Sequence, residues 1–354
     1  MAQSRLPNDR RCRVRRYCLA LLFLLGLVIG APAEAHPPYG LVVDPAGNAY
    51  FSDLETVWRL DPGGRLSVFR PPVAGTHVHE LALAPGGAIE GDENRYDPAT
   101  QRHFSGLWRR TPGGKEQAIV PMTERPPPGM GVLQDAAGNR YSTQWRSNED
   151  KRLVLLRRRP DGTVDSVFDE ARGVAVPPQP SVAGVGGMAL GTGGVLFFAD
   201  WDVLRRLAAD GSVATLFVGG AGASLRGLFS ASAGRVLAAD TTGKRVLAVA
   251  TDGTVSTLYR EEGGWLPTAV ALAGERLLVL EANADPYEYD DRVRVIEVKD
   301  GRAEVVAQPA RPKPARNEAP EAGSESSGLF KRIAVGVAVS VALFGVWRQF
   351  RRAA

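Results

Sequence analysis

Histidines are the residues of this chain best suited to site chemistry, and His77, His79 and His103 are three of its four. Because successive side chains of a β-strand alternate between its faces, His77 and His79 would share one face. Two neutral imidazoles placed in this way bind a divalent ion, zinc or calcium, if a third ligand completes the set. We expect Glu90 to be that ligand, because the glycines at positions 86–87 predict a tight hairpin that returns the chain beside the histidines.

A simpler interpretation stays open, in which the two histidines are hydrogen-bonded, solvated residues at the mouth of a channel. Three further residues are candidates for contacts with a ligand. We expect Arg226 to attract a carboxylate or a developing oxyanion, which would make it the catalytic candidate. Tyr39 would lie at the channel mouth, and Glu281 precedes a long polar insertion that contains two tyrosines. Both are predicted to contact the ligand.

A repeat of about 40 to 56 residues is expected to position these side chains. Its first copy contains GLVVDPAGNAYFSD at residues 40–53, then VWRLDPGG at 57–64 and LSVF at 66–69. Short alternating apolar segments separated by turn residues predict four strands, which is one blade of a β-propeller. The blade start recurs five times, at Glu80, Gly131, Gly187, Gly227 and Ala269. The sequence therefore predicts an all-β, six-bladed propeller over residues 36–307, closed without exchange of strands between its ends.

Two rings of equivalent positions follow from this phasing. The residue before each blade start is expected to face the central channel, and these residues are Tyr39, His79, Met130, Gly186, Arg226 and Thr268. The residue that ends each second strand is acidic in five blades; the six are Asp53, Asp92, Gln144, Asp200, Asp240 and Glu281. We interpret this second ring as structural, because such aspartates usually accept hydrogen bonds from the amides of a turn.

The repeat resembles NHL repeats and the related senescence marker protein and gluconolactonase group, across residues 39–307. In that group a glycine, three apolar residues and D-x-x-G-N open each blade. Its members serve as lactonases, lyases, receptors or scaffolds, so the resemblance implies the fold and leaves the function open. The group's calcium site uses a glutamate that opens the first blade and an asparagine in a P-N-G motif. Both are missing here, where PYG stands at residues 38–40 and GGM at 186–188.

The two ends of the chain have the composition of targeting segments. Residues 1–35 combine arginines, an apolar run and a final AEA, which predicts a cleaved signal peptide. Residues 308–328 are rich in Pro, Ala, Glu and Ser and predict a disordered linker. Residues 329–354 predict one transmembrane helix with a basic cytoplasmic tail, although the same segment resembles bacterial sorting signals that are removed. We expect a bacterial protein whose propeller lies in the periplasm or outside the cell.

Charge narrows the range of partners. The formal charge is +4, of which residues 1–35 contribute +4 and 329–354 contribute +5, which leaves −5 for residues 36–328. A negatively charged propeller does not favour nucleic acid. Two functions remain, and whether the chain is an enzyme is open. One is a membrane-tethered propeller that presents a binding face to a small molecule or to an envelope protein or glycan. The other is a metal-dependent hydrolase or lyase that acts on a small substrate at the central channel.

Overall fold

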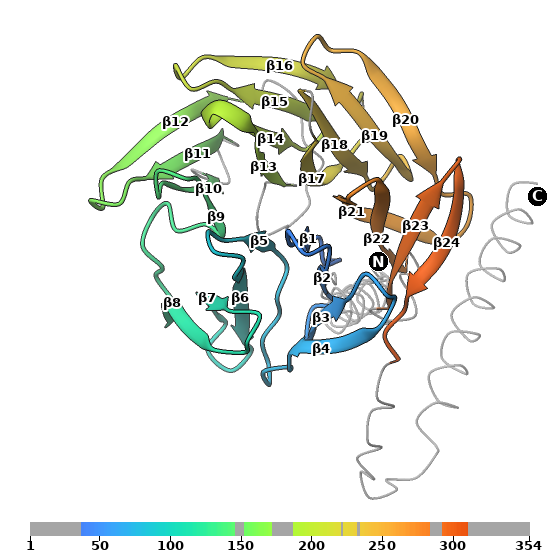
Figure 1. The fold of residues 1–354 in the computed structure, drawn as a ribbon. Helices are drawn as coiled ribbons and strands as arrows, with labels where there is room; N and C mark the ends of the chain where they lie inside the picture. The colour runs from blue at the N-terminus through green and yellow to red at the C-terminus, as the bar shows by residue number, and fades with distance from the viewer. Residues whose placement is uncertain are drawn as a thin grey trace, which may run out of the picture. The chain divides into compact units, whose positions relative to one another are not determined.

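The computed structural model describes residues 37–145, 152–171, 187–220, 222–231, 234–283 and 292–310. Six four-stranded antiparallel sheets surround a central axis (Figure 1). Each sheet consists of four consecutive strands in sequence order, so the propeller has six blades and closes without exchange of strands. Both predictions are confirmed. The predicted signal peptide, linker and C-terminal helix lie outside the described residues, and within those residues no helix is long and apolar enough to cross a membrane.

The strands follow one another blade by blade. Blade 1 contains β1 (Leu41–Val43), β2 (Ala49–Ser52), β3 (Val57–Leu60) and β4 (Leu66–Arg70). Blade 2 contains β5 (Leu81–Leu83), β6 (Ile89–Asp97), β7 (Arg102–Arg110) and β8 (Glu116–Thr123). Blade 3 contains β9 (Leu133–Gln134), β10 (Arg140–Trp145), β11 (Arg152–Arg158) and β12 (Val164–Ala171). Blade 4 contains β13 (Met188–Leu190), β14 (Leu196–Asp200), β15 (Val203–Leu207) and β16 (Val213–Val218). Blade 5 contains β17 (Leu225–Ala231), β18 (Arg235–Asp240), β19 (Arg245–Ala250) and β20 (Val255–Arg260). Blade 6 contains β21 (Trp265–Ala273), β22 (Arg276–Asn283), β23 (Val293–Lys299) and β24 (Arg302–Ala307).

The turn between the first two strands of blade 1 explains the D-x-x-G-N-x-Y pattern of the repeat. Asp44 Oδ1 accepts hydrogen bonds from the backbone amides of Ala46 and Asn48, both at 2.9 Å. Its Oδ2 accepts one from the Tyr50 hydroxyl at 3.0 Å. Gly47 has a φ of 83°, which glycine adopts without the steric cost that other residues pay. Each residue of the pattern therefore shapes a hairpin of the blade.

The apolar core lies between neighbouring blades. Leu41 and Phe51 of blade 1 pack in one cluster with Leu280 and Val295 of blade 6, which closes the ring. Near the axis the first strands approach each other closely. At Gly227, for example, a Cβ atom would lie 2.3 Å from the Cα of Ala269. A side chain at this blade start would therefore collide with the next blade.

Candidate functional site

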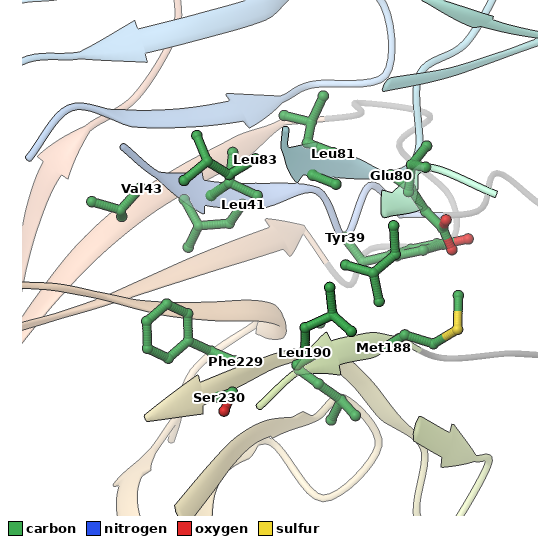
Figure 2. Close-up of a pocket in the computed structure, with 18 residues that line it drawn as sticks. Tyr39, Leu41, Val43, Glu80, Leu81, Leu83, Met188, Leu190, Phe229 and Ser230 are labelled. Carbon is green, nitrogen blue, oxygen red and sulfur yellow. The ribbon is translucent and has the colours of Figure 1, made fainter. Parts of the chain in front are cut away.

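A cavity of about 250 Å³ lies among the first strands of the blades, along the axis of the propeller. Figure 2 shows its two ends: the oxygen atoms of Tyr39 and Glu80 lie close together at one end, and apolar side chains extend from there toward Val43 and Phe229. Tyr39 and Glu80 both precede a first strand, so they lie where the chain enters β1 and β5. We call this polar end the channel mouth, and it contains the candidate site.

Glu80 is the residue that sequence reasoning missed. It occupies the repeat position at which blades 1, 3, 4 and 5 have Gly40, Gly131, Gly187 and Gly227. Blade 2 therefore places a carboxylate in the cavity lining at a position where four other blades have no side chain. The sequence itself indicated this residue, because a charged residue where the other repeats have glycine departs from the folding pattern, and such departures are typical of functional sites.

The Asp92 carboxylate holds this part of blade 2 in place. Its Oδ1 accepts hydrogen bonds from the backbone amides of His79 and Glu80, at 2.8 and 2.7 Å. Its Oδ2 accepts one from the Asn94 side chain at 2.5 Å, and Ser105 Oγ donates to Asn94 Oδ1 at 2.8 Å. The predicted structural role of the acidic ring thus applies to Asp92, which also brings a second carboxylate to the mouth.

Two acidic residues of the same ring behave as predicted elsewhere in the propeller. Asp53 Oδ1 accepts a hydrogen bond from the amide of Thr56 at 2.7 Å, and Asp240 Oδ1 accepts one from Gly243 at 3.0 Å. Both carboxylates therefore order turns. The side chain of Gln144 lies outside the described residues.

The two histidines lie at the edge of the mouth. The ring of His79 lies 6.3 Å from that of Tyr39, centre to centre, and its Nδ1 lies 3.6 Å from Asp92 Oδ2. His77 is exposed, its backbone pairs with that of Asn94, and its ring lies 6.1 Å from that of His79. The structure thus brings His79 near the carboxylate of Asp92.

Glu90 has a different role from the one predicted. Its side chain is fully buried, and Oε2 accepts a hydrogen bond from Arg140 Nη1 at 2.7 Å. Oε1 accepts bonds from Arg109 Nε at 2.6 Å and Arg140 Nη2 at 3.0 Å. Both oxygens are therefore engaged by guanidinium groups of β7 and β10. As a correction to the sequence analysis, Glu90 links blades 2 and 3 and does not join His77 and His79.

A preassembled metal centre is not found in the part of the chain that the structure describes. No group of three His, Cys, Asp or Glu side chains there has a geometry that could hold a metal ion. At the mouth the best donor, Asp92, already accepts two amide hydrogen bonds through one oxygen and the Asn94 amide through the other. The described residues do not fit the predicted zinc or calcium site, and the chemistry below is derived from the side chains alone.

Burial and like charge perturb the acid at the mouth. Burial, together with the negative charge of Asp92, raises the pKa of Glu80 to about 8, and a hydrogen bond with Tyr39 acts in the opposite direction. Burial, with Glu80 and Asp92, also raises the pKa of Tyr39 well above 10, so its phenol stays protonated. The mouth thus contains an acid that exchanges its proton near neutral pH.

Arg226 brings a positive charge close to Tyr39. Its guanidinium carbon lies 5.7 Å from the centre of the Tyr39 ring, and its Nε donates to Ser224 Oγ at 3.4 Å. Within the described residues it forms no ion pair. A guanidinium without a carboxylate partner beside a cavity is suited to bind an anionic group of a ligand.

Glu281, the other residue that was predicted to contact the ligand, forms an ion pair within blade 6. Glu281 is fully buried in blade 6, and its Oε2 accepts a hydrogen bond from Arg294 Nε at 2.7 Å. Burial raises the pKa of Glu281, whereas Arg294 lowers it. Glu281 does not line the cavity. Thr268 is also fully buried, Met130 packs beside a core cluster between blades, and Gly186 lies outside the described residues.

The insertion of blade 2 forms a long hairpin next to the mouth. β6 and β7 are nine residues each, and Asn94, close to the mouth, pairs with Ser105. Two residues further along β6, Tyr96 pairs with His103 and their rings lie 4.7 Å apart. Because alternate residues share a face, Asp92, Asn94 and Tyr96 follow one another on the side of the hairpin that begins at the mouth.

Comparisons with known proteins find solved structures of low sequence identity. No family model matches the chain, and no curated protein matches it. Similar solved structures include virginiamycin B lyase from Staphylococcus aureus, at 16% identity and a TM-score of 0.47, covering 78% of this chain and 85% of that one. They also include a gluconolactonase from Xanthomonas campestris, at 14% identity and a TM-score of 0.48, covering 71% of this chain and 84% of that one. At such identities the likeness concerns the fold alone.

Proposed function

We propose that the protein is a hydrolase that acts on a small ester or lactone at the channel mouth, with Glu80 as the acid–base residue. The observation that carries the proposal is the position of the Glu80 carboxylate. It lines a cavity beside Asp92 and Tyr39, and its pKa is raised to about 8. A displaced pKa with identified causes, in a cavity, is typical of catalytic acids and bases.

The mouth offers a group for each step of such a reaction. Ionised Glu80 takes a proton from water while the water oxygen attacks the carbonyl carbon. Arg226 and the protonated Tyr39 hydroxyl stabilise the negative charge that develops on the carbonyl oxygen. As the bond to the leaving oxygen breaks, Glu80 returns the proton to that oxygen. Protons balance, and Glu80 ends the cycle ionised.

A first test is Arg226→Met in the full-length protein, assayed with 4-nitrophenyl esters and small lactones. Methionine keeps much of the length of the side chain and removes its charge, so oxyanion stabilisation is lost. We expect kcat/KM to fall about 100-fold, the loss measured for single oxyanion donors in other enzymes. Arg235→Met is the matched control, because Arg235 is exposed at the start of β18 in the same blade. Equal activity of the two variants would remove Arg226 from the mechanism.

A second candidate function is recognition of an envelope protein or glycan without catalysis. The observation that favours it is the blade 2 hairpin, on which the Tyr96 side chain is 50% exposed and stacks against His103. Tyrosines exposed beside polar groups are common at binding surfaces. Absence of turnover by the native protein, together with metal analysis that finds none bound, would favour this alternative. Bound metal would instead support the prediction of a metal-dependent hydrolase or lyase.

We also propose that the propeller acts outside the cytoplasm of a bacterium, anchored through the predicted helix at residues 329–354. The support is the apolar run followed by Arg348, Arg351 and Arg352, which the positive-inside tendency places in the cytoplasm. Protease added to spheroplasts is expected to release a fragment of propeller size, detected with an antibody to the propeller. If the full-length protein stays uncleaved under treatment that degrades an exported control protein, the orientation is the reverse.

A further inference from the structure

The cavity continues beyond the proposed reacting groups into an apolar channel. Leu41 and Val43 line it from blade 1, Leu83 from blade 2, Leu190 from blade 4 and Phe229 from blade 5 (Figure 2). The four steps along the chain from Tyr39 to Val43 correspond to a depth of about 13 Å, at roughly 3.3 Å per residue of strand. The polar mouth and the apolar channel form a single cavity.

These apolar side chains are not fully packed by the protein. Leu83 is 37% exposed, and Val43, Leu190 and Phe229 are only partly buried. Their counterparts between the blades, such as Phe51 and Leu280, are fully buried. The channel therefore presents apolar surface to whatever occupies it, and an apolar ligand would stabilise the complex by removing that surface from water.

We infer that the substrate is an amphiphile, with a carboxylate or ester head at the mouth and a linear apolar tail in the channel. The inference rests on the proposed function for the head and extends it to the tail. The charge of Arg226 determines the orientation of the ligand. This guanidinium has no ion pair among the described residues and lies at the polar end, so the negatively charged head of the ligand would bind there. At about 30 Å³ per water-sized group, a volume of 250 Å³ accommodates roughly eight such groups. Because the head occupies part of this cavity, the whole ligand, head included, corresponds to a linear carboxylate of about eight carbons.

The test is calorimetric titration of the full-length protein with linear carboxylates from acetate to dodecanoate, below their micelle concentrations. Each added methylene is expected to increase the affinity about fourfold until the chain reaches about eight carbons, and longer chains to gain little. Ser230→Phe fills the channel from β17, because Ser230 lines the cavity. In that variant the gain should end at a shorter chain, with the affinity for acetate unchanged. Ser256→Phe, at an exposed position of β20, is the matched control and should follow the native protein.

Two outcomes overturn the inference: equal affinity of the native protein for butyrate and octanoate, or the same dependence on chain length in Ser230→Phe as in the native protein. The outcomes also separate tail from head. Ester hydrolysis without dependence on chain length leaves the proposed function and removes the apolar tail. If binding depends on chain length but the protein hydrolyses neither 4-nitrophenyl acetate nor 4-nitrophenyl octanoate, the amphiphile is a ligand and the proposed hydrolase function is wrong. The acetate titration and a melting curve show that Ser230→Phe is folded.

Discussion

Replacement of Glu90 by alanine is expected to lower the free energy of unfolding by about 3–5 kcal/mol, which is the usual cost of removing one partner from a buried ion pair. Glu90 is fully buried, and Arg140, which it holds, is 7% exposed. Arg140 Nη1 also donates to the carbonyl of Gly131 at 3.0 Å. This bond compensates only in part for the hydrogen bonds to Glu90 that Arg140 would lose. Without Glu90, a positive charge stays in the interface between blades 2 and 3 with no carboxylate beside it.

Urea unfolding of the native protein and of Glu90→Ala measures the difference. Glu124→Ala is the control, because Glu124 pairs with Arg102 at the surface, where the two side chains are 43% and 58% exposed. Exposed pairs contribute about 1 kcal/mol or less. The double variant Glu90→Met with Arg140→Met should recover part of the loss, since it removes both charges. A loss below 1 kcal/mol in Glu90→Ala, with loss of a bound metal, would instead support the metal role predicted from sequence.

The misplacement of Glu90 in the sequence analysis has a specific cause in the register of one hairpin. The glycines at 86–87 do return the chain beside β5, as predicted, and Ala84 and Ala88 close the turn. That turn places Glu90 opposite Ala82. The residue that arrives next to the start of β5 is Asp92, whose amide donates to the carbonyl of Glu80 at 3.3 Å. A shift of two positions along β6 therefore decides which carboxylate reaches the mouth, and sequence spacing alone does not specify it.

The fold was predictable because its determinants are local and repeated six times. The pattern around Asp44, Gly47 and Tyr50 builds its own hairpin from hydrogen bonds between residues at most six positions apart. The site depends on contacts between blades, such as Arg226 of blade 5 over the ring of Tyr39 in blade 1. The sequence analysis did place Tyr39 and Arg226 in the same ring of positions, which was expected to face the central channel. It did not identify Glu80, because that position was used only to mark the phase of the repeat.

Replacement of Glu80 by glutamine is expected to reduce kcat for ester hydrolysis by about 10²–10⁴-fold, the range for loss of a general acid or base. Glutamine has nearly the same shape and can still bond with Tyr39, but it cannot accept the proton of the attacking water. In the native protein the rate should rise as the pH increases through about 8, because Glu80 acts as a base only after it loses its proton. This rise should be absent from the residual activity of Glu80→Gln.

The raised pKa of Glu80 also predicts how the stability of the protein changes with pH. The direction of this change is opposite to that expected for a carboxylate in an ordinary ion pair. The pKa of Glu80 is raised in the folded protein from 4.5 to about 8, so ionisation opposes folding. The native protein should therefore lose stability as the pH rises from about 4.5 through 8, whereas Glu80→Gln should not. At pH 9 the variant is expected to melt at a temperature equal to or above that of the native protein. Loss of activity in a protein of equal or greater stability then reflects chemistry and not unfolding.

Glu275→Gln completes the comparison, because Glu275 is exposed in the turn between β21 and β22 and should change neither the rate nor its pH dependence. Two results would contradict the role assigned to Glu80. One is a rate for Glu80→Gln within threefold of that of the native protein. The other is a rise through pH 8 that persists in the variant, which would assign the titration to another group at the mouth. In either case the base would have to be sought among the neighbours of Glu80, and Asp92 is the first to test, because its carboxylate accepts a hydrogen bond from the Glu80 amide.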